Sequence, residues 1–353
     1  MKVLFNTQPA AFQSQIFGGA EIQLLKTKEY LEKLGVKVKF FDLYNDKVED
    51  FDILHNFGMS RDTNFLCNVA KKMNTKIALS SIYWPPTDLI FSDEKVKGAG
   101  KIVFERMSLL ETELNPFSKV YPYKNFLKIA DVILPNSETE KDVLVKRFKT
   151  DPNKILPVPN GVDKKYLQAK PDLFFKNFKT RDFVLYVGRI DPRKNLLKLV
   201  RAMRSLSIPL VILGNPAPSQ VDYLKQCKKE AHGSKISFIK GLPKDDPLLI
   251  SAYAAAKTLV LPSWYETPGL VALEAGLAGC NIAITSKGST KDYFGDLAEY
   301  CNPTKISSIK NSVLQAHRKK NGQDLRNHIL NNFTWEAVAE KTLSAYKKIY
   351  SKK

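Results

Sequence analysis

Short apolar segments alternate along the chain with longer stretches in which apolar residues recur every three or four positions. In the first half, the apolar segments predict strands at Lys2–Asn6, Val36–Phe41, Asp52–Asn56, Lys76–Ser81 and Asp131–Pro135. Apolar residues recur on one face of a helix predicted from about Glu21 to Leu34. This alternation is typical of a parallel α/β sheet, whose strands are joined by helices.

The same plan restarts after a linker rich in Lys, Pro and Asp, between about Asp163 and Arg181. Further strands are predicted at Phe183–Val187, Pro209–Leu213, Lys235–Ile239, Thr258–Leu261 and Asn281–Ala283, with helices from Asn195, Val221, Asp246 and Leu270 and a final helix from Trp335 to Tyr350. The stretch from Trp84 to Lys128 shows no clean strand and predicts helices and loops over the sheet's carboxyl edge. Two successive α/β units imply a cleft, because ligands bind outside the carboxyl ends of such strands.

The most informative chemistry lies between Pro262 and Gly276, where a strand runs into a loop and then into a helix. A helix that begins just past a strand directs free N–H groups and its positive dipole end towards a ligand, which favours phosphate. Glu266 precedes this helix, and Glu274 lies roughly 6 Å further along it. Two carboxylates that bracket a phosphate site suit a ligand with hydroxyls on both sides of its phosphates, such as a nucleotide sugar.

Two other segments carry candidate phosphate-binding groups. In Val187–Asn195, Gly188 permits a close turn, and the cations Arg189 and Lys194 would stabilise a departing diphosphate. The alternative for that segment is a solvent-exposed basic loop. Gly18 and Gly19 precede the first predicted helix, where adjacent glycines let the backbone approach a ligand closely, although a plain turn explains them as well.

The Glu-x7-Glu pattern within Trp264-Tyr-Glu-Thr-Pro-Gly-Leu-Val-Ala-Leu-Glu-Ala-Gly276 resembles the retaining glycosyltransferases of the glycogen-synthase-like and sucrose-synthase-like group, glycosyltransferase family 4. The Gly-Arg…Lys-Asn loop and Pro159-Asn-Gly-Val-Asp163 are similar to segments of the same family. The resemblance is specific from about 183 to 276 and looser over 1–135. It implies the GT-B fold, in which two Rossmann-like doubly wound parallel-sheet domains face each other across a cleft. The implied divisions are 1–165 as the acceptor-side domain, 166–333 as the nucleotide-sugar domain, and 334–353 as a helix that crosses back to the first domain.

The resemblance also implies a role for each candidate residue. Glu274 would bind the ribose hydroxyls of the donor, and Glu266 would hold hydroxyls of the transferred sugar near the anomeric carbon. The implied diphosphate site comprises Arg189, Lys194, Gly18, Gly19, Gly269 and the amides of Leu270 and Val271. Backbone groups at Lys240, Gly241 and Leu242 would hold the nucleobase, which leaves the base unspecified, with UDP or GDP expected. No metal and no cofactor are expected, because the cations take the place of a metal.

Several polar residues depart from this pattern or have simpler explanations. Many relatives carry a donor-contacting His after the strand that here reads Ile77–Pro86, so Ser80, Ser81 or Tyr83 must fill that space. His55 either meets a substrate or is a structural histidine. Asp50 and Asp52 have the Asp-x-Asp spacing of metal sites in another glycosyltransferase fold, although capping of a strand edge by Asp52 is the simpler interpretation.

Composition changes this picture little. The 353 residues include 44% hydrophobic and 26% charged residues, and the net charge is +19. Residues 1–165 carry 25 Lys and Arg against 21 Asp and Glu, whereas residues 166–353 carry 30 against 15. A basic surface attracts nucleic acid, anionic lipid or a charged substrate, but no nucleic-acid-binding signature is present. The four isolated cysteines are expected to be free thiols, and no apolar run approaches the roughly 20 residues of a membrane span.

The sequence therefore predicts a retaining, metal-independent glycosyltransferase that moves a sugar from a nucleoside-diphosphate sugar to a glycan or lipid-linked acceptor. A cytoplasmic location is expected, with weak peripheral contact at the inner face of the membrane left open, and cell-envelope or exopolysaccharide synthesis is the expected setting. Two alternatives remain. One is a sugar-nucleotide 2-epimerase of similar fold, and the other is a non-enzymatic basic protein that binds nucleic acid or a membrane surface.

Overall fold

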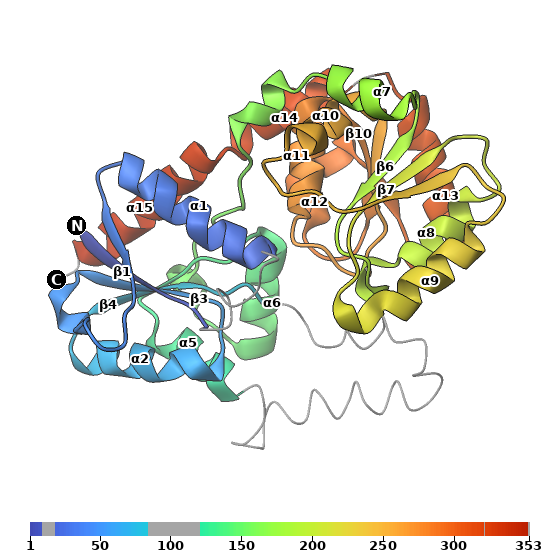
Figure 1. The fold of residues 1–353 in the computed structure, drawn as a ribbon. Helices are drawn as coiled ribbons and strands as arrows, with labels where there is room; N and C mark the ends of the chain where they lie inside the picture. The colour runs from blue at the N-terminus through green and yellow to red at the C-terminus, as the bar shows by residue number, and fades with distance from the viewer. Residues whose placement is uncertain (9–17, 84–120, 321, 352–353) are drawn as a thin grey trace, which may run out of the picture. The chain divides into compact units, whose positions relative to one another are not determined.

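The computed structural model describes residues 1–8, 18–83, 121–320 and 322–351. These residues divide into two compact units. Unit 1 contains the described residues up to Gly161 together with those from Trp335 onwards, and unit 2 contains those from Val162 to Thr334. Each unit is a parallel sheet with helices on both faces (Figure 1). The predicted class, two Rossmann-like α/β domains of the GT-B type, is confirmed.

Unit 1 contains a five-stranded sheet in the order β2-β1-β3-β4-β5. The strands are β1 Lys2–Asn6, β2 Lys37–Phe40, β3 Ile53–Phe57, β4 Lys76–Ser80 and β5 Val132–Ile133. The helices are α1 Gly19–Lys33, α2 Arg61–Lys72, α5 Tyr121–Ile129, α6 Glu138–Phe148 and α15 Trp335–Tyr350. All four strand pairs are parallel, with β1 between β2 and β3. The chain therefore reverses its direction across the sheet between β1 and β3, and loops after those two strands form the place where such sheets bind ligands.

The last helix, α15, packs against α1 of unit 1. Its buried residues Val338, Thr342, Tyr346 and Ile349 recur at helical spacing, so they form one face. Tyr346 is fully buried, and its hydroxyl lies 2.6 Å from Nδ1 of His55 on β3. The end of the chain is thus anchored to the sheet of unit 1 by a packed face and a polar contact.

Unit 2 contains a six-stranded parallel sheet in the order β11-β10-β9-β6-β7-β8. The strands are β6 Val184–Val187, β7 Leu210–Leu213, β8 Ile236–Ile239, β9 Thr258–Leu261, β10 Asn281–Thr285 and β11 Glu299–Cys301. The helices are α7 Asp172–Phe178, α8 Leu196–Met203, α9 Val221–Glu230, α10 Pro247–Ala255, α11 Leu270–Ala278, α12 Thr290–Phe294, α13 Ile306–Arg318 and α14 Gln323–Asn332. Here the strand order reverses between β6 and β9, so the segments that follow these strands occupy the ligand-binding position of the sheet.

The predicted strands are present with small changes at their ends. The strand predicted at Asp131–Pro135 is limited to Val132–Ile133, and the one predicted at Asn281–Ala283 extends to Thr285. The short strand β11 was not predicted. Of the predicted irregular stretch, residues 84–120 lie outside the described residues, and the remainder contains α5.

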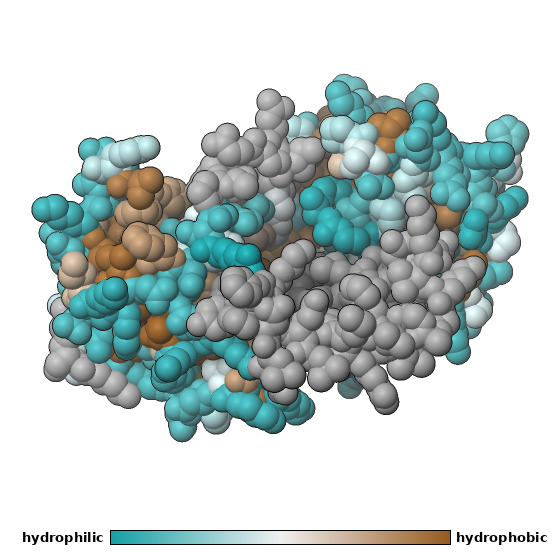
Figure 2. Space-filling view, turned by 90° about the horizontal axis from the view of Figure 1, so that it is seen from below, coloured by the Kyte–Doolittle hydropathy of each residue, from teal (hydrophilic) through white to brown (hydrophobic). Residues whose placement is uncertain are grey.

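The surface is mainly polar, as Figure 2 shows for one face, with some hydrophobic residues among the hydrophilic ones of unit 1. Several large apolar side chains of unit 1 are exposed: Leu34, Leu43, Tyr44, Phe65 and Met73. Among the described helices, none combines the length and apolar character needed to cross a bilayer. The four cysteines are buried free thiols, as predicted.

Candidate functional site

In unit 2, the ends of β6 and β7 approach each other closely enough to require glycine. Gly188 has φ +155°, and a Cβ on Gly214 would lie 2.0 Å from the carbonyl oxygen of Gly188. Pairing of the two segments continues past the strands, because the Ile190 amide donates to the Asn215 carbonyl at 3.0 Å. The backbone after β6 is therefore fixed just before the candidate phosphate loop.

The candidate phosphate loop folds around the carboxylate of Asp191. This side chain accepts hydrogen bonds from the amides of Arg193 (2.8 Å) and Lys194 (3.2 Å) and is only 7% exposed. The Nε of Arg189 lies 4.0 Å from Asp191 Oδ2, and the Arg189 side chain is half exposed. Asp191 thus sets the direction of a loop whose cations partly face solvent, where an anionic ligand has access to them.

Glu266 is a buried carboxylate held by a cation and a hydroxyl. The Nζ of Lys194 lies 2.5 Å from Glu266 Oε1, and the hydroxyl of Ser263 donates to the same oxygen at 2.6 Å. Glu266 is only 3% exposed, so these partners offset the cost of burying its carboxylate. Removal of Lys194 would leave a buried charge without its main counterion.

The backbone of Glu266 is fixed as firmly as its side chain. Its amide donates to the carbonyl of Lys287 (3.2 Å), and its carbonyl accepts from the amide of Ser289 (2.9 Å). Between them lies Gly288, with φ +93°, where an added Cβ would be 2.1 Å from the Glu266 carbonyl oxygen. Glycine is required here on two grounds, positive φ and close approach.

Glu274 lies on α11, and a lysine and a tyrosine contact its carboxylate oxygens. The Nζ of Lys244 is 3.3 Å from Oε1, and the buried hydroxyl of Tyr253 donates to Oε2 at 2.9 Å. Glu274 is 4% exposed. Burial, followed by the charge of Glu274, raises the pKa of Tyr253 well above its ordinary value, so the phenol remains a donor.

The helix that carries Glu274 begins at the loop that carries Glu266. Gly269, with φ +80°, is the N-cap of α11, and a Cβ there would lie 3.5 Å from Glu266 Oε2. The amides of Leu270 and Val271 belong to the first turn, whose N–H groups have no acceptor within the helix. The start of α11 is therefore adjacent to the Glu266 carboxylate.

The predicted base-binding segment follows β8. Lys240 is exposed, and Leu242 is half-buried. Both backbone polar groups of Gly241 pair with the side chain of Asn215: the Gly241 amide donates to Oδ1 at 3.0 Å, and its carbonyl accepts from Nδ2 at 3.5 Å. Asn215 thus fixes the backbone of this segment.

Unit 2 therefore links three of its predicted site residues in one chain of contacts, from Arg189 through Asp191 and Lys194 to Glu266. Glu274 lies on the helix that starts beside Glu266. Four supporting residues from separate loops and helices were not predicted: Ser263, Tyr253, Lys244 and Asn215. Ser263 alone had a local signal, because it directly precedes the Trp-Tyr-Glu segment.

Unit 1 carries Gly18 and Gly19 at the start of α1. Gly18 is the N-cap residue, and its amide donates to the Glu21 carboxylate at 2.8 Å. Close by lies a cavity of about 280 Å³, lined by Thr7, Gln8, Ala20, Glu21, Phe57, Gly58, Met59, Ser60, Ile82 and Tyr123. Phe57 is the last residue of β3, and the other lining residues follow β1, β3 and β4 or belong to α1 and α5. The cavity therefore lies at the carboxyl edge where the strand order of unit 1 reverses.

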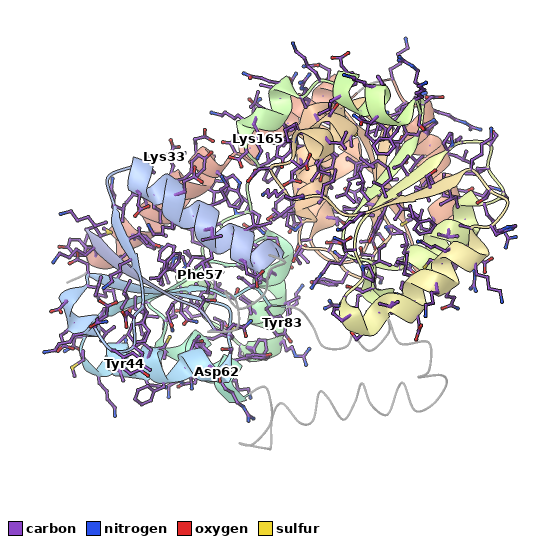
Figure 3. The ribbon with its side chains drawn as sticks, in the orientation of Figure 1. Lys33, Tyr44, Phe57, Asp62, Tyr83 and Lys165 are labelled. Carbon is purple, nitrogen blue, oxygen red and sulfur yellow. The ribbon has the colours of Figure 1, made fainter. Side chains whose placement is uncertain are left out.

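The side chains of the polar residues predicted to fill the space of the missing His are buried inside unit 1. Ser80, Ser81 and Tyr83 are each at most 3% exposed, whereas Ile82 between them lines the cavity. Figure 3 labels Tyr83 and Phe57, which lie towards the same edge of the sheet.

His55 and the Asp-x-Asp segment have structural contacts. His55 is buried, with Nδ1 near Tyr346 and Nε2 3.0 Å from Ser80 Oγ, and burial lowers its pKa to about 3. It is therefore a neutral structural histidine at physiological pH. Asp52 accepts from the amide of Lys2 at 2.7 Å, which ties the first strand to its neighbour.

Comparison with known proteins supports the class of protein that this fold and this site indicate, a glycosyltransferase. Residues 170–332, all within unit 2, match the family model described as Glycosyl transferases group 1. The O-antigen chain mannosyltransferase B of Escherichia coli is 24% identical over 236 residues, which cover 63% of this chain and 61% of that protein. The chain thus matches less than two thirds of the length of this relative.

Solved structures agree with the fold. Sucrose-phosphate synthase from Thermosynechococcus elongatus superimposes with a TM-score of 0.76 at 18% identity, covering 100% of this chain and 99% of the other. The Anabaena protein HepE, in complex with UDP and glucose, gives a TM-score of 0.71 at 12% identity, covering 98% and 99%. Fold, family model and relatives together support a GT-B glycosyltransferase.

Proposed function

We propose that the protein is a retaining glycosyltransferase that uses a nucleoside-diphosphate sugar without a metal ion. The observation that carries the proposal is the pair of buried carboxylates, Glu266 and Glu274, on either side of the start of α11. Each has a lysine partner within 3.3 Å. Buried carboxylates with spare lone pairs are suited to accept sugar hydroxyls, and a helix start between them is suited to phosphate.

Glu274 is assigned to the ribose of the donor. Lys244 and Tyr253 hold its carboxylate in place, yet each oxygen keeps a lone pair for a ribose hydroxyl. The nucleobase is assigned to the segment Lys240–Leu242, whose backbone is fixed by Asn215. UDP and GDP remain the expected nucleotides, and HepE provides a structural precedent for UDP on this fold.

Glu266 is assigned to the hydroxyls of the transferred sugar, and the cations to the leaving diphosphate. Lys194 is bound to Glu266, and Arg189 is half exposed in the same loop. As the glycosidic bond breaks, negative charge grows on the diphosphate, where Arg189, Lys194 and the amides of Leu270 and Val271 stabilise it. In a front-face mechanism, the departing phosphate oxygen accepts the proton of the acceptor hydroxyl, so the new bond keeps the configuration of the old one.

The acceptor is assigned to unit 1, where the cavity at the carboxyl edge offers hydroxyl, amide and apolar groups. A glycan or lipid-linked sugar in cell-envelope or exopolysaccharide synthesis is the proposed acceptor class. The Escherichia coli relative named as an O-antigen chain mannosyltransferase supports this setting. We place the protein in the cytoplasm, with peripheral contact at the membrane where its acceptors are lipid-linked.

The test is a thermal-shift screen against UDP, GDP, ADP and their sugars, followed by transfer assays with the sugar nucleotide that binds. A nucleotide that binds only the folded protein raises its Tm. Arg189→Ala and Glu274→Ala are each expected to remove most transfer while the fold is retained. Arg193→Ala is the matched control, because Arg193 is a half-exposed cation of the same loop that also contacts Asp191. Near-normal turnover in either site variant would contradict the assignment.

A further inference from the structure

Unit 1 contains a buried carboxyl group that the proposed mechanism does not use. Glu140, in the first turn of α6, is 2% exposed. Its Oε1 accepts hydrogen bonds from the Ser81 hydroxyl (2.5 Å) and the Tyr83 amide (2.8 Å), and its Oε2 accepts from the Asn136 amide (2.8 Å). Burial raises the pKa of this carboxyl, while the three donors oppose the shift. A buried carboxyl is costly, so its retention here calls for an explanation.

The residue between the two donors to Oε1 has an unusual backbone. Ile82 has φ +45°, in the left-handed region. A β-branched side chain is disfavoured there by contact with its own backbone, and such strain persists only where the surroundings enforce it. Glu140 binds the residue on each side of Ile82 through one oxygen atom. This arrangement clamps the backbone on both sides of the strained residue.

The strained residue is also the one that reaches the cavity. Ser81 and Tyr83 are buried, whereas Ile82 lines the 280 Å³ cavity together with Phe57 and Met59. We propose that Glu140 is a positioning residue that holds Ile82 as an apolar wall of this cavity, and that the cavity takes a single uncharged sugar ring. The inference rests on the proposed function in that this ring is part of the acceptor.

The size and lining of the cavity define the ligand class. Its volume lies just below the roughly 300–1,000 Å³ of pockets for drug-sized ligands, which fits one ring. Ile82, Phe57 and Met59 offer apolar surface to a ring face, and the Thr7, Gln8 and Ser60 side chains offer hydrogen bonds to hydroxyls at its edge. Among the described lining residues, Glu21 is the one charged side chain, and it is acidic. A phosphorylated ring would therefore meet repulsion.

Binding of methyl α-D-mannopyranoside, methyl α-D-glucopyranoside and mannose 6-phosphate, measured by ligand-observed NMR on the full chain, tests the ligand class. At least one neutral glycoside is expected to bind, and mannose 6-phosphate more weakly than either. Ile82→Gly is expected to weaken binding of the neutral glycoside roughly tenfold, through loss of one apolar contact. Stronger binding of the phosphate, or no binding of either neutral glycoside, would overturn the proposal.

Ser81→Ala tests the clamp, because it removes one of the two contacts that flank Ile82 at little change of volume. We expect glycoside affinity to fall several-fold while nucleotide affinity is unchanged. Ser137→Ala is the matched control: Ser137 accepts from the Glu140 amide at 3.0 Å and caps α6, but it is none of the three donors to the Glu140 carboxylate. It should lower Tm without changing glycoside affinity. An equal loss of glycoside affinity in both variants would mean that Glu140 has only a structural role, and it would contradict the proposed clamp.

A double variant separates strain from packing. Glycine adopts positive φ without penalty, so in an Ile82→Gly background the clamp has no strain to oppose. In this background, Ser81→Ala should lower Tm by clearly less than it does in the wild-type protein, which carries Ile82. Equal Tm losses in both backgrounds would refute the clamp. Nucleotide binding, which depends on unit 2 residues, is measured on every variant, so failure of the donor assignment is distinguishable from failure of this one.

Discussion

Gly288→Ala is the sharpest perturbation of the donor site that substitutes none of the proposed contact residues. Gly288 follows β10 and forms a bridge with Glu266. The added methyl group would lie 2.1 Å from the Glu266 carbonyl oxygen and 3.0 Å from the Glu266 carbonyl carbon and amide nitrogen. The neighbour is backbone, so it cannot rotate away.

The size of the effect follows from two separate terms. The first is the positive φ of +93°, which costs an alanine about 1–2 kcal/mol. The second is displacement: Cβ atoms do not approach closer than 3.0 Å, so the Glu266 backbone must retreat by about 1 Å. A misplacement of about 1 Å at a reacting centre costs about 100-fold in rate. We therefore expect a loss of transfer of about that size, with an additional loss of stability.

Gly233→Ala is the matched control for the first term. Gly233 has φ +73°, and an added Cβ would meet nothing within 4 Å. It should lose stability through strain alone and keep full transfer activity. The assay is kcat/KM for the donor, with the free energy of unfolding from denaturant titration, on both variants and the wild type.

Sugar transfer by Gly288→Ala at the rate of Gly233→Ala would contradict the predicted effect of displacing Glu266. That result would mean either that Glu266 does not need its present position or that it does not contact the transferred sugar. A loss of activity in both variants, matched by equal loss of folded protein, would also contradict a specific role for the Glu266–Gly288 contact.

Two further predictions concern buried hydroxyl and imidazole groups. Tyr253→Phe removes the hydrogen bond to Glu274 Oε2, a contact to a charged group worth about 1.5–3 kcal/mol. Nucleotide Kd, measured by calorimetry, should rise about tenfold or more, and an unchanged Kd would argue against ribose binding at Glu274. For His55, the folded-state pKa of about 3 lies below the ordinary 6.5, so its stabilising effect is complete above pH 6.5 and is lost as pH falls towards 3. Wild type should therefore lose about 1.4 kcal/mol of unfolding free energy per pH unit below 6.5 relative to His55→Gln. Parallel stability curves for the two proteins between pH 6.5 and 5 would contradict this linkage.

The elements that sequence pattern predicted well are those with uninterrupted apolar character and clear ends. Strands Lys2–Asn6 and Thr258–Leu261 and the helix Trp335–Tyr350 have the predicted bounds. Strand β11 was not predicted, because it has three residues, of which only Cys301 is buried. A strand so short has no periodicity to detect.

The individual residues of the candidate site were predictable where they lie in one continuous segment. Glu266, Gly269 and Glu274 come from a single loop and helix, so local spacing brings them together. Their supporting residues are distant in sequence: Lys194 reaches Glu266 across 72 positions, and Tyr253 reaches Glu274 from another helix. Such partners depend on tertiary packing, which spacing does not report.

In unit 1, too, sequence spacing did not identify the residue that reaches the cavity. The sequence predicted that Ser80, Ser81 or Tyr83 fills the space of the missing His. Ile82, which has a positive φ, lines the cavity instead. The sequence around Ile82 does not indicate its left-handed backbone conformation. That conformation is imposed by Glu140, which lies about 60 positions away in sequence. Tertiary contacts therefore decide which of four neighbouring residues can meet a ligand.

The most direct test of the central claim is a crystal structure of the protein with the nucleoside diphosphate that raises its Tm most. We expect ribose oxygens within about 2.6–3.2 Å of the Glu274 carboxylate and phosphate oxygens at the start of α11 beside Arg189 and Lys194. A nucleotide bound away from Glu274, with these side chains unchanged, would contradict the claim that this site of unit 2 binds the donor.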